Sequence, residues 1–200
     1  MLVLRRVALL LALASLTPAA RGQTPPPPSP SQSLDLDALM ARLAAVPERR
    51  ARFQEEKRLA VLNEPLRTAG RLLYRRPSHL EKITDWPDAE SLVVEGSRLV
   101  LTEGQEPPRV VDLSAQPELR ALVDAVRGPL SGNLAALRRS FAVTASGTQA
   151  AWRLRLVPTD PGAARLLARV EVGGTGDTPR EVVVQQANGD EDRLLIEELP

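Results

Sequence analysis

The sequence contains no cysteine, a single histidine and only five aromatic residues among its 200 positions. Without cysteine, the chain cannot form disulfides or thiolate metal sites, and it cannot carry a lipid-modified N-terminal cysteine. With His79 alone, it lacks the repeated ligands of the common zinc sites. Because aromatic residues are few, burial must come mainly from leucine, valine and alanine. We therefore expect a protein that binds no metal ion and no cofactor and has an aliphatic core.

The chain carries little net charge. Its 26 basic and 25 acidic residues nearly balance, and only two of the basic residues are lysines. Removal of residues 1–22, which include three arginines, would leave 23 basic against 25 acidic residues. A surface that binds nucleic acid needs an excess of basic residues, so this balance argues against nucleic acid as a partner.

The N-terminus has the features of a secretory signal peptide. Arg5 and Arg6 provide its positive charge, Val7–Leu16 is a short apolar run, and small residues follow within Ala20–Gly22. An apolar run of this length is too short to span a bilayer, which needs about 20 residues. We therefore predict a cleaved signal peptide at residues 1–22 and a mature protein in the periplasm, with an uncleaved anchor as the alternative.

The next segment, residues 23–33, is rich in proline and serine and offers almost nothing to bury. Such a composition predicts a disordered spacer, with recognition of the polyproline as the alternative. Hydrophobic periodicity begins after it, and we expect one folded domain at residues 34–200.

Residues 70–96 are the centre of that domain and predict three strands separated by turns. Arg76 and Pro77 end the first strand, because the residue before a proline is held extended and proline donates no hydrogen bond to a sheet. Trp86 and Pro87 make the second break, and Glu95 and Gly96 form a hairpin turn. Short, closely spaced strands of this kind indicate an antiparallel sheet.

Three helices are expected around these strands. Residues 34–46 have apolar residues every three or four positions, as do 117–127 and 133–141. Pro117 suits a first helical turn, and Gly128 with Pro129 predicts the end of the second helix. Residues 53–62 alternate between apolar and polar positions and are interpreted as a strand, although helix propensity makes a helix the competing interpretation.

The C-terminal half predicts further strands. Along Ala150–Val157, Trp152, Leu154 and Leu156 alternate with arginines, which is typical of a half-buried strand. Other strands are expected at residues 99–102, 109–113, 166–172, 181–186 and 193–198. The fold class is therefore mainly β (α+β), with about eight or nine antiparallel strands and three helices.

No group of residues has the spacing of a catalytic or metal site. His79 lies just after the turn at Pro77 and is expected in a solvent-exposed loop, although it is the only obvious base for a hydrolase. Asp190–Asp192 lacks the spacing of a calcium loop, and Gly173–Gly176 lacks the lysine that follows in a phosphate loop. Glu55 precedes Glu56 on a strand, so the two cannot work as a pair. We expect no enzymatic activity.

Several of these residues form the pattern of a known family. Gly70, Leu72, the pair Arg76 and Pro77, the Leu-Val before Gly96, and Phe53 with Gln54 resemble the LolA-type periplasmic carriers of outer-membrane lipoproteins. The resemblance runs from about residue 34 to the C-terminus. It implies a curved antiparallel sheet that forms an incomplete barrel around a hydrophobic cavity, with an N-terminal helix and two short lid helices.

The resemblance also implies a set of site residues. By position, Arg76 corresponds to the arginine that hydrogen-bonds lid carbonyls and closes the empty carrier. The alternative is an edge arginine in water, with Arg75 as the inward residue if the register shifts by one. Alternation and helical spacing give the predicted cavity lining: Leu59, Leu72, Tyr74, Leu80, Leu92, Val94, Leu101, Leu119, Leu122, Leu154 and Leu156.

The function expected from this resemblance is a monomeric periplasmic carrier that shelters the acyl chains of a lipidated cargo, most simply a lipoprotein. An inner-membrane exporter would be its donor, and an outer-membrane protein its acceptor. The cavity strands contain few aromatic residues and the spacer is unusual, so a glycolipid or another lipid remains an alternative cargo. A non-catalytic scaffold that binds protein through an edge strand is the main rival function.

Overall fold

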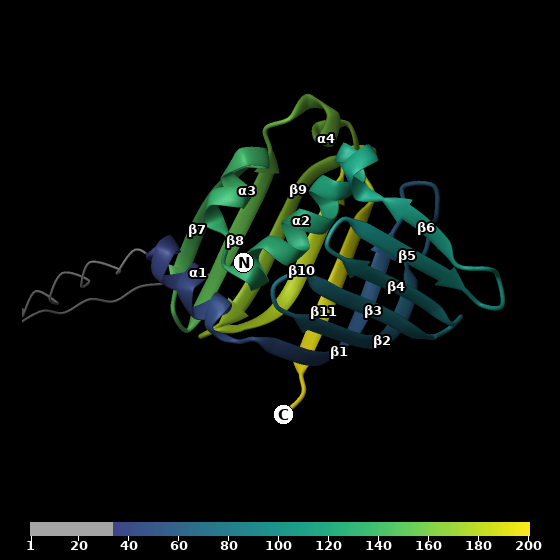
Figure 1. Ribbon diagram of the computed structural model, residues 1–200, viewed down its shortest axis with the longest axis horizontal. Coiled ribbons are helices and arrows are strands. Elements are labelled where there is room, and N and C mark those ends of the chain that lie inside the picture. Colours follow the sequence, from purple (N-terminus) through teal and green to yellow (C-terminus); the bar gives the residue numbers. More distant parts are fainter. Residues whose placement is uncertain (1–33) are drawn as a thin grey trace, which may run out of the picture. The chain divides into compact units, whose positions relative to one another are not determined.

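The computed structural model describes residues 34–200, and these form one curved antiparallel sheet with helices against its inner face (Figure 1). The sheet has eleven strands in the order β6-β5-β4-β3-β2-β1-β11-β10-β9-β8-β7, and β6 and β7 are its free edges. It is therefore not closed into a barrel, which confirms the predicted fold class. The signal peptide and spacer predicted at residues 1–22 and 23–33 lie outside the described residues.

The strands and helices form three groups along the chain. The first group comprises α1 (Leu36–Ala45), β1 (Glu48–Arg58), β2 (Leu66–Arg75), β3 (His79–Trp86), β4 (Glu90–Glu95), β5 (Arg98–Glu103) and β6 (Arg109–Asp112). A short 3-10 helix (Leu113–Ala115) then leads to α2 (Pro117–Ser131) and α3 (Leu134–Ser140). The last group comprises β7 (Phe141–Thr148), β8 (Ala151–Pro158), α4 (Pro161–Leu166), β9 (Leu167–Thr175), β10 (Thr178–Gln186) and β11 (Glu191–Glu198).

The N-terminal segment follows the sequence signals closely. Asp35 caps α1, with its Oδ1 atom accepting a hydrogen bond of 3.1 Å from the backbone N–H of Ala38. In β1, every second residue from Arg49 to Glu55 is buried. The helical interpretation of residues 53–62 is therefore wrong. Pairing with β2 on one side and β11 on the other outweighs the helix propensity of this segment.

One glycine in the centre of the sheet is required by close backbone packing. At Gly70, the pairing of β2 with β3 shifts by one residue. A Cβ atom at this position would lie only 1.9 Å from the carbonyl oxygen of Ile83. Only glycine lets the two strands approach this closely, so Gly70 fixes the path of β3 beside β2.

The expected end of the second helix is wrong, and two further elements were not expected. α2 continues through Gly128 and Pro129 to Ser131, and the left-handed residue Gly132 (φ 67°) ends it. Gly128 lets Leu137 of α3 pack directly on the helix, since a Cβ there would lie 2.4 Å from the leucine side chain. β7 and α4 had no clear signal in the sequence, and residues 34–200 form eleven strands and four α-helices in place of the expected eight or nine strands and three helices.

The buried side chains form two clusters. The larger one joins α1 and α3 to strands β7–β10 and includes Phe141, Leu154 and Leu156. The smaller one joins Val123 of α2 to Val94 and neighbouring residues. α2 therefore contributes side chains to both clusters, and Figure 1 shows it in front of the sheet. None of the helices within residues 34–200 has the length and apolar character that crossing a membrane requires.

Candidate functional site

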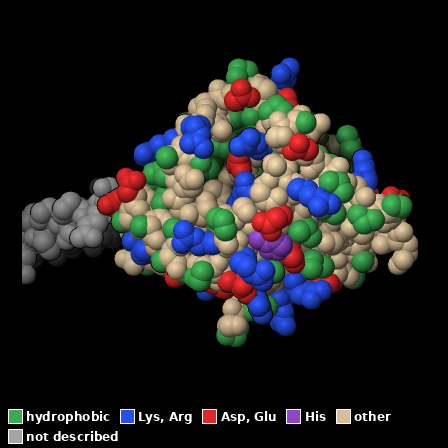
Figure 2. All heavy atoms as spheres, viewed as in Figure 1, with side chains coloured by type: hydrophobic (Ala, Val, Ile, Leu, Met, Phe, Trp, Pro, Cys, Tyr) green, Lys and Arg blue, Asp and Glu red, His purple; other side chains and the backbone are tan. Residues whose placement is uncertain are grey.

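A pocket of about 490 Å³ lies between α2 and the inner face of the sheet. α2 contributes Leu119, Leu122 and Val126 to its wall, while β2 and β3 contribute Leu72 and Leu80. The face drawn in Figure 2 is hollowed near α2, and charged atoms are visible inside the hollow beside hydrophobic ones. The pocket is thus mainly aliphatic, as expected for a chain with few aromatic residues.

The predicted cavity residues divide into two groups. Six of them line this pocket: Leu72, Tyr74, Leu80, Leu92, Leu119 and Leu122. The other five lie outside it: Leu59, Val94, Leu101, Leu154 and Leu156. Val94, Leu154 and Leu156 point to the same side of the sheet as the lining residues but are fully buried in the two core clusters. Whether an inner-face residue is buried in the core or lines the pocket depends on whether a helix packs against it.

Only one of the two predicted lid helices lines the pocket within the described residues. α2 lines the pocket from Leu119 to Leu130, whereas α3 contributes no lining residue within the described chain. α3 instead buries Leu134 and Leu137 in the larger core cluster. The cover of the pocket is therefore α2, supplemented by Leu166 and Leu167 at the junction of α4 and β9.

The strands at the C-terminus provide lining that the sequence analysis did not identify. Val182 and Val184 of β10 and Leu194 and Ile196 of β11 face the pocket. Both pairs are spaced by two residues, and this alternation was a usable signal. It was ambiguous because β11 lies beside β1 in the sheet, a pairing across the whole chain that no local pattern reveals.

A charged cluster closes one end of the pocket. The buried carboxylate of Glu55 accepts hydrogen bonds of 2.7 Å from Thr68 Oγ1 and Lys82 Nζ, and Lys57 Nζ lies 3.7 Å away. The ammonium group of Lys82 also lies 5.0 Å from the centre of the Phe53 ring. Asp192 lines the same end, and burial raises the pKa of its carboxyl group. Both lysines of the chain therefore line this pocket.

An arginine that the sequence analysis missed lies at the opposite end. Arg49 is buried, and its Nη1 atom donates to Glu198 at 2.8 Å. Its Nη2 atom donates to the carbonyl oxygen of Asp177 at 2.7 Å and to that of Leu43 in α1 at 3.4 Å. The alternation of β1, in which every second residue from Arg49 to Glu55 is buried, could have identified this inward position.

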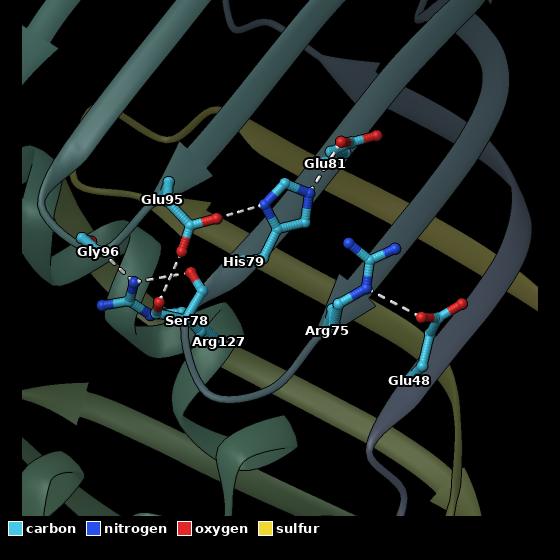
Figure 3. A network of polar contacts seen from close by, with 8 residues as sticks. All are labelled: Glu48, Arg75, Ser78, His79, Glu81, Glu95, Gly96 and Arg127. Carbon is cyan, nitrogen blue, oxygen red and sulfur yellow. Dashed lines mark hydrogen bonds and ion pairs between the residues drawn. The ribbon is translucent and has the colours of Figure 1, made fainter.

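The predicted gate residue, Arg76, follows β2 directly. Its guanidinium group donates a hydrogen bond to the carbonyl oxygen of Ala44 in the last turn of α1. Carbonyl groups at a helix C-terminus attract cations, so this contact holds α1 beside the sheet. Arg75 points elsewhere and donates to Glu48 at 2.9 Å on the exposed side of the sheet (Figure 3). The gating role of Arg76 stays a prediction.

α2 is attached to the sheet through its own arginine. Arg127 Nη1 donates to the carbonyl oxygens of Ser78, at 3.2 Å, and Gly96, at 2.9 Å. These oxygens belong to the turns after β2 and β4 (Figure 3). Arg127 Nη2 is held by Asp124 of the same helix at 2.8 Å. The pocket cover is therefore joined to two turns by polar bonds near the protein surface.

His79 is not in a solvent-exposed loop, contrary to expectation. It begins β3, with 18% of its side chain exposed, and lies between Glu95 Oε2 at 2.6 Å and Glu81 Oε1 at 2.8 Å (Figure 3). The hydrogen bond to Glu95 is the main reason why the pKa of His79 is raised above its usual 6.5. Ser78 Oγ donates to Glu95 and not to the imidazole, so the three side chains do not form a nucleophile-base pair.

Comparison with known proteins gives one family and several distant structural neighbours. The sequence profile of the family described as "Outer membrane lipoprotein carrier protein LolA-like" matches residues 28–198. A LolA superfamily protein from Nitrosomonas europaea is 8% identical, with a TM-score of 0.44 and coverage of 82% of this chain and 92% of that one. No curated protein matches the chain significantly.

Two further solved structures are similar at the same level. A domain from Vibrio parahaemolyticus, described as an outer membrane lipoprotein-sorting protein, is 12% identical (TM-score 0.45, 84% of this chain and 92% of that one). MucB, in its complex with MucA from Pseudomonas aeruginosa, is 10% identical (TM-score 0.42, 84% of this chain). The chain spans only 58% of that MucB structure.

Proposed function

The chain belongs to the LolA-like family of outer-membrane lipoprotein carrier proteins, and we propose that it carries the acyl chains of a lipidated cargo through the periplasm. The observation that carries this proposal is the aliphatic pocket of about 490 Å³ beneath α2. Its volume lies within the range of about 300–1,000 Å³ that is typical of small-molecule sites. A filled core, as expected for a simple scaffold, would leave no such space.

The energetics of transfer favour a pocket of this kind. Each methylene group removed from water contributes about 0.8 kcal/mol, so an acyl chain cannot cross an aqueous compartment freely at a useful rate. A carrier must also release what it binds. Arg127 joins α2 to the turns at Ser78 and Gly96 by hydrogen bonds, which can break without disrupting the sheet.

Membership of this family supports a simple proposal for the cargo and the partners. We propose a lipoprotein as cargo, received from an inner-membrane exporter and delivered to an outer-membrane acceptor by a monomeric carrier. A glycolipid is the second candidate, because the pocket contains the charged cluster around Glu55 as well as aliphatic walls. Binding to MucA, which the MucB structure includes, is not needed for either form of the proposal.

We also propose that the protein is not an enzyme. His79 is the only imidazole in the sequence, and two carboxylates occupy both of its ring nitrogens. It is not among the residues that line the pocket within the described chain. If His79→Ala abolished a measured esterase turnover, this part of the proposal would be wrong.

Mass spectrometry of the native protein, purified from its host without detergent, tests the carrier function. We expect copurified molecules that contain acyl chains. Leu194 and Leu195 are adjacent on β11, but Leu194 lines the pocket whereas Leu195 is 51% exposed on the outer face. Leu194→Trp should therefore reduce the bound lipid by filling the pocket, and Leu195→Trp should not. Absence of lipid from the unmodified protein, or equal amounts in both variants, would contradict the proposal.

A further inference from the structure

Two buried polar atoms of pocket-lining residues lack a hydrogen-bond partner within residues 34–200. Arg49 Nε and Tyr74 Oη are buried, and neither has a partner among residues 34–200. Both side chains line the pocket, although only 7% of Arg49 and 2% of Tyr74 are exposed. A buried polar group without a partner costs free energy, and most such groups in folded proteins are satisfied. A ligand that supplies the missing acceptor would explain both atoms.

The two residues are neighbours in the sheet. Arg49 on β1 pairs directly with Tyr74 on β2, so their side chains stand next to each other on the inner face. The terminal nitrogens of Arg49 are fixed by Glu198 and by the carbonyl oxygen of Asp177, which limits rotation of the guanidinium plane. Burial raises the pKa of Tyr74, so its hydroxyl group stays protonated and can donate.

We propose that Arg49 and Tyr74 bind the acyl carbonyl group of the cargo while its alkyl chain lies beneath α2. This inference rests on the proposed carrier function and adds the polar group that the pocket recognises. A carbonyl-type oxygen has two lone pairs and can accept from both donors at once. Glu198 already balances the charge of Arg49 at 2.8 Å, so an uncharged ester or amide fits as well as a carboxylate.

The charged cluster at the other end of the pocket does not offer the same chemistry. There, Glu55 already accepts from Thr68 and Lys82. The ammonium groups of Lys82 and Lys57 also line this end, but they already lie 2.7 and 3.7 Å from the carboxylate of Glu55. Arg49 Nε and Tyr74 Oη, by contrast, are donors with no acceptor among residues 34–200. The carbonyl group therefore belongs at the end formed by Arg49 and Tyr74.

Calorimetric titration with three probes of equal chain length tests this inference. Decanoate, methyl decanoate and decyltrimethylammonium are each titrated below the concentration at which they form micelles. We expect the two carbonyl compounds to bind the unmodified protein about tenfold more tightly than the ammonium compound. Comparing decanoate with its methyl ester distinguishes a free fatty acid from an esterified or amidated acyl chain as the natural form.

Tyr74→Phe removes the hydroxyl group and keeps the ring. It should weaken both carbonyl compounds by about five- to tenfold and leave the ammonium compound unchanged. Because Oη has no partner among residues 34–200, the same variant should unfold at an equal or higher urea concentration than the unmodified protein. Ser146→Ala, which removes an exposed hydroxyl group of β7 away from the pocket, is the control and should not change the preference for carbonyl compounds.

The possible outcomes distinguish failure of the proposed carbonyl site from failure of the proposed carrier function. Equal affinity for the three probes, or unchanged carbonyl affinity in Tyr74→Phe, would overturn the inference and leave acyl-chain carriage intact. A marked loss of stability in Tyr74→Phe would show that the hydroxyl group has a structural partner, which also overturns it. If none of the probes binds the unmodified protein, the carrier function itself fails.

Discussion

Arg127 on α2 donates a hydrogen bond of 2.9 Å to the carbonyl oxygen of Gly96, which lies 31 residues earlier in the turn between β4 and β5. This bond, together with the one to Ser78, joins the pocket cover to the part of the sheet that it covers. Both acceptors are main-chain atoms, so the attachment depends on the turn conformation and not on a particular partner side chain.

We predict that Arg127→Met loosens α2 without unfolding the protein. Removing a charged donor that binds two carbonyl groups should lower the free energy of unfolding by about 1 to 2 kcal/mol. Hydrogen exchange in α2 should accelerate, and bound acyl chains should dissociate faster. Arg120→Met is the control, because Arg120 makes an exposed pair with Asp124 and should change stability by less than about 0.5 kcal/mol. Unchanged exchange in α2 would show that apolar packing alone holds the cover.

Arg76→Leu should keep the fold and speed the transfer of cargo. The side chain is exposed and its one side-chain hydrogen bond within the described residues goes to Ala44, so its loss should change stability little. A less firmly held α1 should allow faster exchange of a fluorescent fatty acid between carrier and vesicles. The neighbouring change Arg75→Leu removes an exposed ion pair with Glu48 and serves as control. Identical exchange rates in the two variants would refute a gate at Arg76.

Gly70→Ala should destabilise the protein through the backbone. The new Cβ would lie 1.9 Å from the carbonyl oxygen of Ile83, and forced overpacking of this kind costs about 1 to 3 kcal/mol. Gly173→Ala is a matched control in another strand, because its nearest neighbours would be 3.8 Å away. Urea unfolding should show a lower midpoint for Gly70→Ala and a nearly unchanged midpoint for Gly173→Ala. Similar midpoints would mean that β2 and β3 can separate at little cost.

Stability should depend on pH through His79. Its pKa in the folded protein is raised above 6.5, mainly by Glu95, so the protonated imidazole stabilises the fold below pH 6.5. This contribution is lost as the pH rises through the folded-state pKa. The pKa of Glu95 is lowered below 4.5, mainly by His79, so the carboxylate stays ionised throughout that range. Its own contribution disappears only when the pH falls through this lowered pKa.

The test compares the unmodified protein with His79→Gln by urea unfolding from pH 6 to pH 9. The difference in unfolding free energy between them should shrink as the pH rises, because only the unmodified protein loses a favourable charge. A difference that stays constant over this range would show that folding leaves the pKa of the imidazole unchanged.

The sequence predicted the strands of the sheet better than the position of the pocket. Alternation along β8 placed Leu154 and Leu156 correctly on the inner face, but these residues are in the core because α1 and α3 pack over that part of the sheet. Local patterns report which face a side chain occupies. Whether that position is filled or open depends on contacts between distant elements.

The missed features have both long-range and local origins. Arg127 has backbone acceptors that lie 49 and 31 residues away, so no motif could identify it. α4 has only six residues, and β7 contains serine, threonine and glycine in place of a clear apolar alternation. The inward positions of Arg49 and Glu55, by contrast, follow from the alternation through Phe53. That pattern is present in the sequence, because charged residues at these two positions alternate with exposed ones in step with Ala51 and Phe53.

Photo-crosslinking with a fatty acid that carries a diazirine in its alkyl chain tests the central claim most directly. We expect labelled peptides from α2 and from the inner-face residues Leu72 and Val184, which line one pocket from three different elements. Unlabelled fatty acid should compete for this labelling. Labelling confined to the outer face around Trp86 and Leu195, which are 58% and 51% exposed, would contradict the account.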